Sequence, residues 1–185
     1  ENRANKGFTV IQAVILAEDD GLRKPNVYGE IPLIELNPEK PNEKYFEHVD
    51  FIVNKAERLG LQIALLPTWG DKVYSERKGI GPIVFNKSNA FTYGEFLGNR
   101  YKDQPVIWIL GGDRNIANME AMNIWRAMAA GIRSGDKGQN LMSYHPAGEQ
   151  SSSQYKEDWI DFNMFQSGHA KKYMPIYQFA KTDYN

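Results

Sequence analysis

The chain is predicted to be an α/β protein of the (β/α)8 TIM-barrel type, with only part of the barrel present. Apolar runs typical of buried strands alternate along the chain with stretches whose apolar residues recur at helical spacing. Strands joined through helices form parallel pairs with right-handed crossovers. The segment after the first strand, residues 17–20, is acidic, whereas a doubly wound nucleotide-binding sheet would carry a glycine-rich phosphate loop there.

Five apolar runs are predicted to be strands. Apolar residues at both odd and even positions of a run are typical of parallel strands that are buried on both faces. Each run is bounded by glycine, proline or polar residues, which mark its ends. The runs cover residues 7–16, 61–69, 105–112, 140–145 and 159–166.

Helices are predicted between these strands, because apolar residues recur three and four positions apart. The predicted helices cover residues 43–59, 90–102, 118–134 and 171–182, with a helix-like segment at 1–6. A long loop from about residue 22 to residue 42 holds four of the nine prolines, and a second runs to about residue 89. Loops of this length inside a compact domain are usually functional.

A complete barrel of this type needs about 250 residues and eight strands. The chain has 185 residues and ends soon after its fifth predicted strand. We therefore expect one partial catalytic domain over residues 1–185 that holds about strands 2 to 6. One strand would precede Glu1 and two would follow Asn185.

The composition excludes several classes of partner. Lysine and arginine total 22 against 23 acidic residues, so no net field attracts nucleic acid or an anionic membrane. No apolar run approaches the roughly 20 residues that span a bilayer. Cysteine is absent, which excludes disulfides and thiolate metal sites, and no cofactor is expected. A neutral partner such as carbohydrate fits better, and no signal peptide is seen in this sequence.

The third strand run delivers Gly111, Gly112, Asp113, Arg114 and Asn115 at its carboxyl end. Chemistry in parallel barrels is carried by side chains at this end of the strands. Strand alternation would place Asp113 on the same side as Gly111, and we predict Asp113 to be the catalytic carboxylate. Arg114 is expected to point away from it or to bind another group. The alternative is that Asp113 caps a helix or pairs with Arg114 at the surface.

Other polar and aromatic side chains near strand ends could contact a sugar. An indole face can stack on a sugar ring, and amide, imidazole or carboxylate groups can bind hydroxyls. For each residue a structural role in core packing, loop shape or helix capping stays open, and Tyr28 could act as a lid. The candidates are Trp69, Asp71, Asn115, His145, Gln166 and His169, with Glu18 and Tyr28 on the loops.

Six segments carry a family resemblance: residues 7–12 (GFTVIQ), 26–29 (NVYG), 45–50 (YFEHVD), 66–71 (LPTWGD), 111–115 (GGDRN) and 161–168 (DFNMFQSG). Together they resemble the apiosidase-like proteins of glycoside hydrolase family 140, over nearly the whole chain. Members of that family are bacterial (β/α)8-barrel enzymes, and the characterised activity releases apiose from pectic side chains.

The resemblance implies a retaining glycosidase that acts on plant cell-wall polysaccharide in the periplasm or outside the cell. It implies that Asp113 is the acid/base and that the nucleophilic glutamate lies near the seventh strand, beyond Asn185. The isolated chain is therefore expected to be poorly active or inactive.

Two other functions stay open on the residues alone. Asp71, Asp113, His145 and His169 lie near one predicted rim and could bind a divalent metal for hydrolysis, although their spacing matches no tight ligand motif. The chain could also be a non-catalytic carbohydrate-binding fragment. Such modules are usually β-sandwiches, which the alternation of strands and helices does not resemble.

Overall fold

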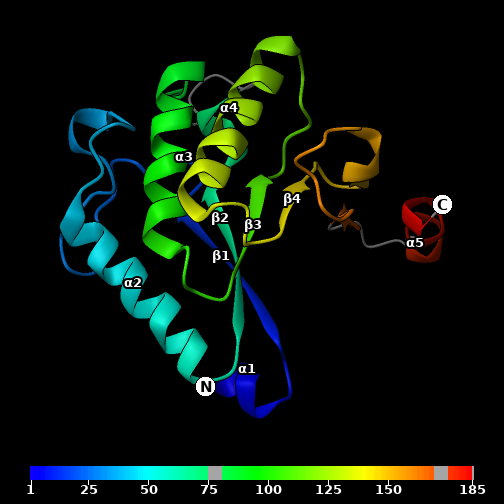
Figure 1. Cartoon of the computed structure of the whole chain (residues 1–185), viewed down its shortest axis with the longest axis horizontal. Coiled ribbons are helices and arrows are strands. Elements are labelled where there is room, and N and C mark those ends of the chain that lie inside the picture. The colour runs from blue at the N-terminus through cyan, green and yellow to red at the C-terminus, as the bar shows by residue number, and fades with distance from the viewer. Residues whose placement is uncertain (75–80, 169–174, 185) are drawn as a thin grey trace.

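The computed structural model describes residues 1–74, 81–168 and 175–184. At its centre lies a parallel sheet with the strand order β1-β2-β3-β4 (Figure 1). The strands are β1 (Val10–Leu16), β2 (Gln62–Thr68), β3 (Val106–Gly111) and β4 (Met142–His145). Each strand pairs with the next one along the chain, so the order never reverses. This winding is that of a (β/α) barrel, because a doubly wound sheet reverses its strand order at a switch point.

Three helices cover one face of the sheet: α2 (Glu43–Arg58), α3 (Lys87–Tyr101) and α4 (Met119–Asp136) (Figure 1). The short α1 (Asn2–Asn5) precedes β1, and α5 (Ile176–Tyr184) lies apart from α2 to α4. The core between sheet and helices is built around Trp108 and Tyr144 from the strands and Tyr93 and Trp125 from the helices. The barrel-type α/β fold class is thus confirmed.

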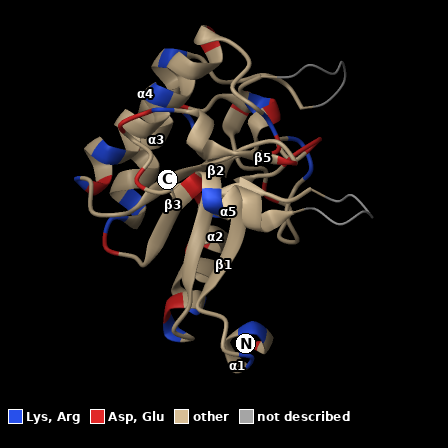
Figure 2. Cartoon of the chain, turned by 90° about the vertical axis from the view of Figure 1, so that its right-hand side faces the viewer, with Lys and Arg blue, Asp and Glu red and all other residues tan. Residues whose placement is uncertain are grey.

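The strands carry no charged residue, and lysine, arginine and acidic residues are interspersed over the helices and loops (Figure 2). None of the helices in the described ranges is long and apolar enough to cross a membrane.

Asparagine begins each of the three covering helices. The side chains of Asn42, Asn86 and Asn118 accept hydrogen bonds from backbone N–H groups in the first turns of α2, α3 and α4. Asn86 forms a reciprocal capping box with Asn89. Each cap satisfies a donor that the helix itself leaves free, which fixes where the helix starts.

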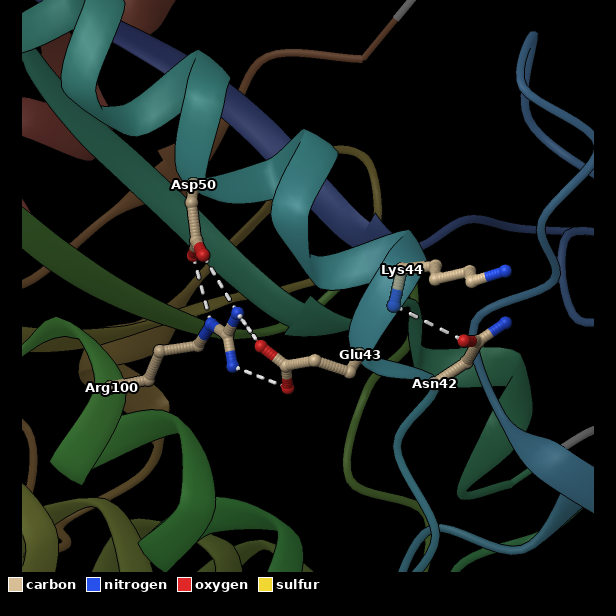
Figure 3. Close-up of polar contacts among 5 residues, drawn as sticks. All are labelled: Asn42, Glu43, Lys44, Asp50 and Arg100. Carbon is tan, nitrogen blue, oxygen red and sulfur yellow. Dashed lines mark hydrogen bonds and ion pairs between the residues drawn. The ribbon is translucent and has the colours of Figure 1, made fainter.

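Arg100 ties α3 to α2 (Figure 3). Its guanidinium donates two hydrogen bonds to Asp50, at 2.7 and 2.8 Å, and two to Glu43, at 2.6 and 2.9 Å. The same group lies over the rings of Phe46 and Phe96, 5.5 and 5.6 Å from their centres. Bidentate geometry and aromatic stacking are what the planar guanidinium provides and a lysine would not.

The helices α3 and α4 approach each other through four glycines. A Cβ atom on Gly94 would lie 2.4 Å from the Met128 carbonyl oxygen, and one on Gly131 would lie 2.1 Å from that of Phe91. Gly98 and Gly135 show the same closeness one turn farther along. The two backbones therefore touch directly, without side chains between them.

The prediction of a fifth strand in the parallel sheet, over residues 159–166, is wrong. Only Phe165–Gln166 (β6) is a strand, and it pairs antiparallel with β5 (Gln150–Ser151), outside the main sheet. The backbone N–H of Asp161 donates to the Met142 carbonyl, while the N–H of Met142 donates to the Asp161 carboxylate. The hydroxyl of Ser143 on β4 also donates to the Phe162 carbonyl. Because side chains supply one partner in two of these three hydrogen bonds, the segment forms no backbone ladder with β4. Four parallel strands, not five, are present in the described residues.

The remaining predicted elements are confirmed apart from their ends. The second predicted helix starts three residues earlier, at Lys87, because Asn86 caps it. The last helix begins at Ile176, and residues 169–174 lie outside the described ranges.

Candidate active site

The site is built where β3 ends in a glycine turn. Gly111, Gly112 and Asp113 have φ angles of 92, 121 and 50°. A Cβ atom on Gly111 would lie 2.5 Å from the His145 carbonyl oxygen, and one on Gly112 would lie 2.8 Å from the Trp69 ring. Both positions need glycine, for the backbone conformation and for the space.

Strand alternation does not extend to Asp113, contrary to the sequence-based prediction. Three consecutive residues with positive φ end the strand geometry, so the turn sets the direction of this side chain. Aspartate tolerates the left-handed conformation better than most residues do. Residues held in such conformations are often found at functional sites.

Asp113 is held at its backbone N–H and at its carboxylate. Its backbone N–H donates to Nδ1 of His145 at 3.3 Å, and its Oδ1 accepts a hydrogen bond from Nε2 of Gln166 at 2.7 Å. The same Oδ1 lies 3.9 Å from His145 Nδ1. The side chain stays 34% exposed, so the carboxylate is anchored and still reachable from solvent.

The carboxylate opens into a pocket of about 330 Å³. The pocket is lined by Asp113, Arg114, Gly148, Glu149, Gln166 and Gly168. It lies at the carboxyl end of the sheet, where barrel enzymes place their chemistry.

His145 is buried at the end of β4, and its ring centre lies 5.6 Å from that of Trp69. Its Nδ1 is also 3.1 Å from the Pro146 carbonyl oxygen. Without a proton, Nδ1 accepts the N–H of Asp113. In the other tautomer, Nδ1 donates to the Pro146 carbonyl instead.

The loop after Asp113 is held from two sides. The hydroxyl of Tyr144 donates to the Arg114 carbonyl at 2.8 Å, and the hydroxyl of Tyr155 accepts the N–H of Ile116 at 2.9 Å. Burial raises the pKa of Tyr144 well above its usual value and also raises the pKa of Tyr155, so both remain protonated. A loop fixed in this way pre-organises the carboxylate.

The side chains of Arg114 and Asn115 form hydrogen bonds with other groups of the protein around the loop. Arg114 donates to the backbone carbonyl of Asp113 at 2.8 Å, and no ion pair with the Asp113 carboxylate is found in the described residues. The side-chain oxygen of Asn115 lies 3.3 Å from two donors, the N–H of Ala147 and the hydroxyl of Tyr155. Asn118, not Asp113, caps α4.

Asp71 is placed away from solvent. It is fully buried beside Lys72, whose ammonium donates to Asp71 at 2.8 Å and to the Asp19 carbonyl at 2.9 Å. This buried pair joins the loops that follow β1 and β2. In this structure Asp71 shapes the rim rather than presenting a carboxylate to a ligand.

Two loop residues that were predicted to contact a sugar, Tyr28 and Glu18, have no contact with Asp113 in the described residues. Tyr28 is 67% exposed and packs its ring against His48 of α2, 5.1 Å between ring centres. Glu18 is exposed on the loop after β1. The predicted His169 lies outside the described residues.

Glu149 is a pocket residue that sequence reasoning missed. It has a φ angle of 63°, and its carboxylate lines the same pocket as that of Asp113. The available signal was its position, since it is the first acidic residue after the end of β4. In the described ranges, no group of three or more histidine or acidic side chains is arranged to hold a metal ion.

Comparison with known proteins shows that the chain is similar to glycoside hydrolases. A family model for the catalytic domain of apiosidase-like proteins matches residues 1–185. A glycoside hydrolase family 5 structure from Bacteroides vulgatus ATCC 8482 is 35% identical, with a TM-score of 0.74, and covers 90% of this chain. A second structure, named glycoside hydrolase, is 33% identical, with a TM-score of 0.75, and covers 93%. A search of curated proteins finds no match.

A more distant structure shares the fold alone. The endoglucanase Cel5A from Thermotoga maritima is 15% identical over 77% of this chain and 41% of its own, with a TM-score of 0.51. The two closer structures are much longer than this chain, which spans 35% and 39% of their lengths.

Proposed function

Since the chain belongs to the apiosidase-like catalytic-domain family, we propose that it is part of a retaining glycoside hydrolase in which Asp113 is the general acid/base. The observation that carries this proposal is the placement of Asp113. Its carboxylate lies beyond the carboxyl end of β3, in a pocket, anchored through one oxygen and still partly exposed. A barrel enzyme that protonates a leaving oxygen needs such a group there.

In the proposed reaction, the protonated Asp113 gives its proton to the glycosidic oxygen as the bond to the anomeric carbon breaks. A second carboxylate, about 5 to 5.5 Å away, attacks that carbon and forms a glycosyl-enzyme. Asp113, now ionised, takes a proton from the water that hydrolyses this intermediate. The buried His145 and the fixed loop keep Asp113 in place through both steps.

We propose apiosides of pectic side chains as the substrate, and glycoside hydrolase family 140 as the family within which the activity belongs. The support is the match to the apiosidase-like family model and the six sequence segments that resemble family 140 proteins. Trp69, beside His145 at the rim, would offer its ring to the sugar.

The test is hydrolysis of aryl glycosides, an apioside among them, by the full-length protein and its Asp113→Ala variant, with and without azide. The variant should lose roughly 10²- to 10⁴-fold in turnover, the usual contribution of a general acid/base. Azide should restore turnover and yield a glycosyl azide of retained configuration. Unchanged turnover in the variant would exclude Asp113 as the acid/base.

A further inference from the structure

Gln166 meets Asp113 from a separate part of the fold. It lies on β6, where its carbonyl oxygen accepts the N–H of Glu149 at 2.8 Å and its partner across the ribbon is Gln150. Its side-chain Nε2 donates to Asp113 Oδ1 at 2.7 Å. The two residues are 53 positions apart in the sequence, so only the packing of the β5–β6 ribbon brings them together.

The side-chain amide of Gln166 contacts Asp113 through its nitrogen, and its oxygen is buried. This oxygen, Oε1, has no hydrogen-bond partner in the described ranges. Oδ1 is an acceptor both when the carboxylate is ionised and when Oδ2 carries the proton, so the donor that faces it in both states is the N–H group of the amide. The contact therefore depends on the N–H donor facing Asp113.

We propose that Gln166 is a positioning residue for the general acid, which fixes Asp113 Oδ1 so that Oδ2 faces the leaving oxygen. The inference rests on the proposed function of Asp113. No hydrogen bond to Oδ2 is found in the described residues, which leaves this oxygen for proton transfer. A hydrogen bond to one oxygen removes rotational freedom of the carboxylate about its side-chain bonds, and this is the freedom that proton transfer must lose.

The charged and titratable groups around Asp113 do not provide this anchor. His145 lies 3.9 Å from Oδ1 and contacts the backbone N–H. Arg114 binds the backbone carbonyl, and Glu149 lines the pocket without a hydrogen bond to the Asp113 side chain. Within the described part of the chain, Gln166 is the side chain that donates to the carboxylate.

The test compares leaving groups in Gln166→Met, which keeps the length of the side chain and removes its donor. For an apioside with an alkyl leaving group, kcat/KM should fall roughly 10- to 100-fold, the factor that a hydrogen bond to a charged group represents. For a dinitrophenyl apioside, which needs little protonation to leave, kcat/KM should stay close to that of the wild type. Equal losses for both substrates would show that Gln166 binds substrate and would overturn the inference.

Gln150→Met is the matched control, because it changes the residue opposite Gln166 in the same ribbon. It should leave both kcat/KM values unchanged; a selective loss like that of Gln166→Met would assign the effect to the ribbon and overturn the inference.

A second readout does not depend on activity. In Asp113→Ala, the side-chain amide resonances of Gln166 should shift in NMR spectra, because their acceptor is lost, and unshifted resonances would contradict the contact. If Asp113→Ala keeps full activity, the proposed function is wrong, whatever the resonances do. If Asp113→Ala is inactive and Gln166→Met shows no leaving-group dependence, only the inference about Gln166 is wrong.

Discussion

Glycines serve the α3–α4 contact and the end of β3 in different ways. In the helix pair, Gly94, Gly98, Gly131 and Gly135 lie inside helices, and a Cβ atom on any of them would meet the backbone of the other helix. At the strand end, the glycine turn before Asp113 has positive φ angles as well as close neighbours. The helix glycines are needed for space alone, whereas the turn glycines are needed for space and conformation.

The glycines between α3 and α4 serve stability, whereas the glycines at the end of β3 serve the proposed chemistry. The helix pair lies on one face of the sheet, where a change pushes two backbones apart and weakens the fold. The turn lies next to Asp113, Trp69 and His145, where a change moves the groups of the proposed reaction. Substitutions in the two regions should therefore differ in which measurement they affect.

The largest effect is expected for Gly131→Ala. The new methyl group would lie 2.1 Å from the Phe91 carbonyl oxygen, so α3 and α4 must separate along the contact. The free energy of unfolding should fall by about 3 kcal/mol, the upper part of the range for overpacking. Urea denaturation followed by circular dichroism measures this.

The control for Gly131→Ala is the neighbouring Ala130→Gly, on the exposed side of α4. It should cost about 1 kcal/mol through helix propensity alone. Propensity by itself would make Gly131→Ala stabilising, so a stabilised Gly131→Ala variant would refute the close contact between the helices.

Gly112→Ala tests the other side of the comparison. The methyl group would meet the Trp69 ring, and a φ of 121° is strained for alanine, so the turn should shift and carry Asp113 with it. We expect kcat/KM to fall about 100-fold, as a displacement near 1 Å can cause. The rate is measured per folded molecule, and a loss explained by unfolding alone would count against the role of the turn.

Two single hydrogen-bond deletions, one at α4 and one at the loop after Asp113, test whether stability and catalysis are affected separately. Trp108→Phe removes the 3.0 Å hydrogen bond from the indole to the fully buried carboxylate of Asp136. It should cost about 2 kcal/mol of stability and leave the catalytic rate of the folded molecules unchanged.

Tyr144→Phe removes the hydrogen bond to the Arg114 carbonyl and should cost about 1 kcal/mol of stability. Only the second variant should also lower kcat. A fall in kcat for Trp108→Phe would show that the two regions are coupled.

The smallest effect is expected for Glu43→Gln. The hydrogen bond from Arg100 lowers the pKa of Glu43, so the pair stabilises the fold at neutral pH. This contribution is lost as the pH falls through the lowered pKa. Because the Glu43 side chain is 65% exposed, the loss at neutral pH should be about 0.5 kcal/mol, and it should shrink as the pH falls through the lowered pKa. Urea denaturation over a series of acidic pH values measures it, and a difference that grew at low pH would reverse the assigned sign.

The sequence by itself determined the alternating elements and the placement of Asp113 after β3. Apolar runs indicate buried strands and apolar residues at helical spacing indicate helices, so the presence and order of β1 to β4 and α2 to α4 could be predicted locally. The end of the apolar run before Gly111 and Gly112 likewise placed Asp113 at the carboxyl end of a strand.

Only the tertiary structure decided which distant segments meet. Residues 159–166 were predicted to be a strand of the main sheet, but the Asp161 side chain, in place of a backbone carbonyl, accepts the N–H of Met142 on β4. The sequence offered Asp71 as a residue that could contact a sugar, but in the structure its side chain is buried and hydrogen-bonded to Lys72. The donor of Gln166 and the glycine contact of α3 with α4 depend on packing between segments far apart in the chain. Local patterns report how each segment is buried, whereas its partners are set by the geometry of the whole fold.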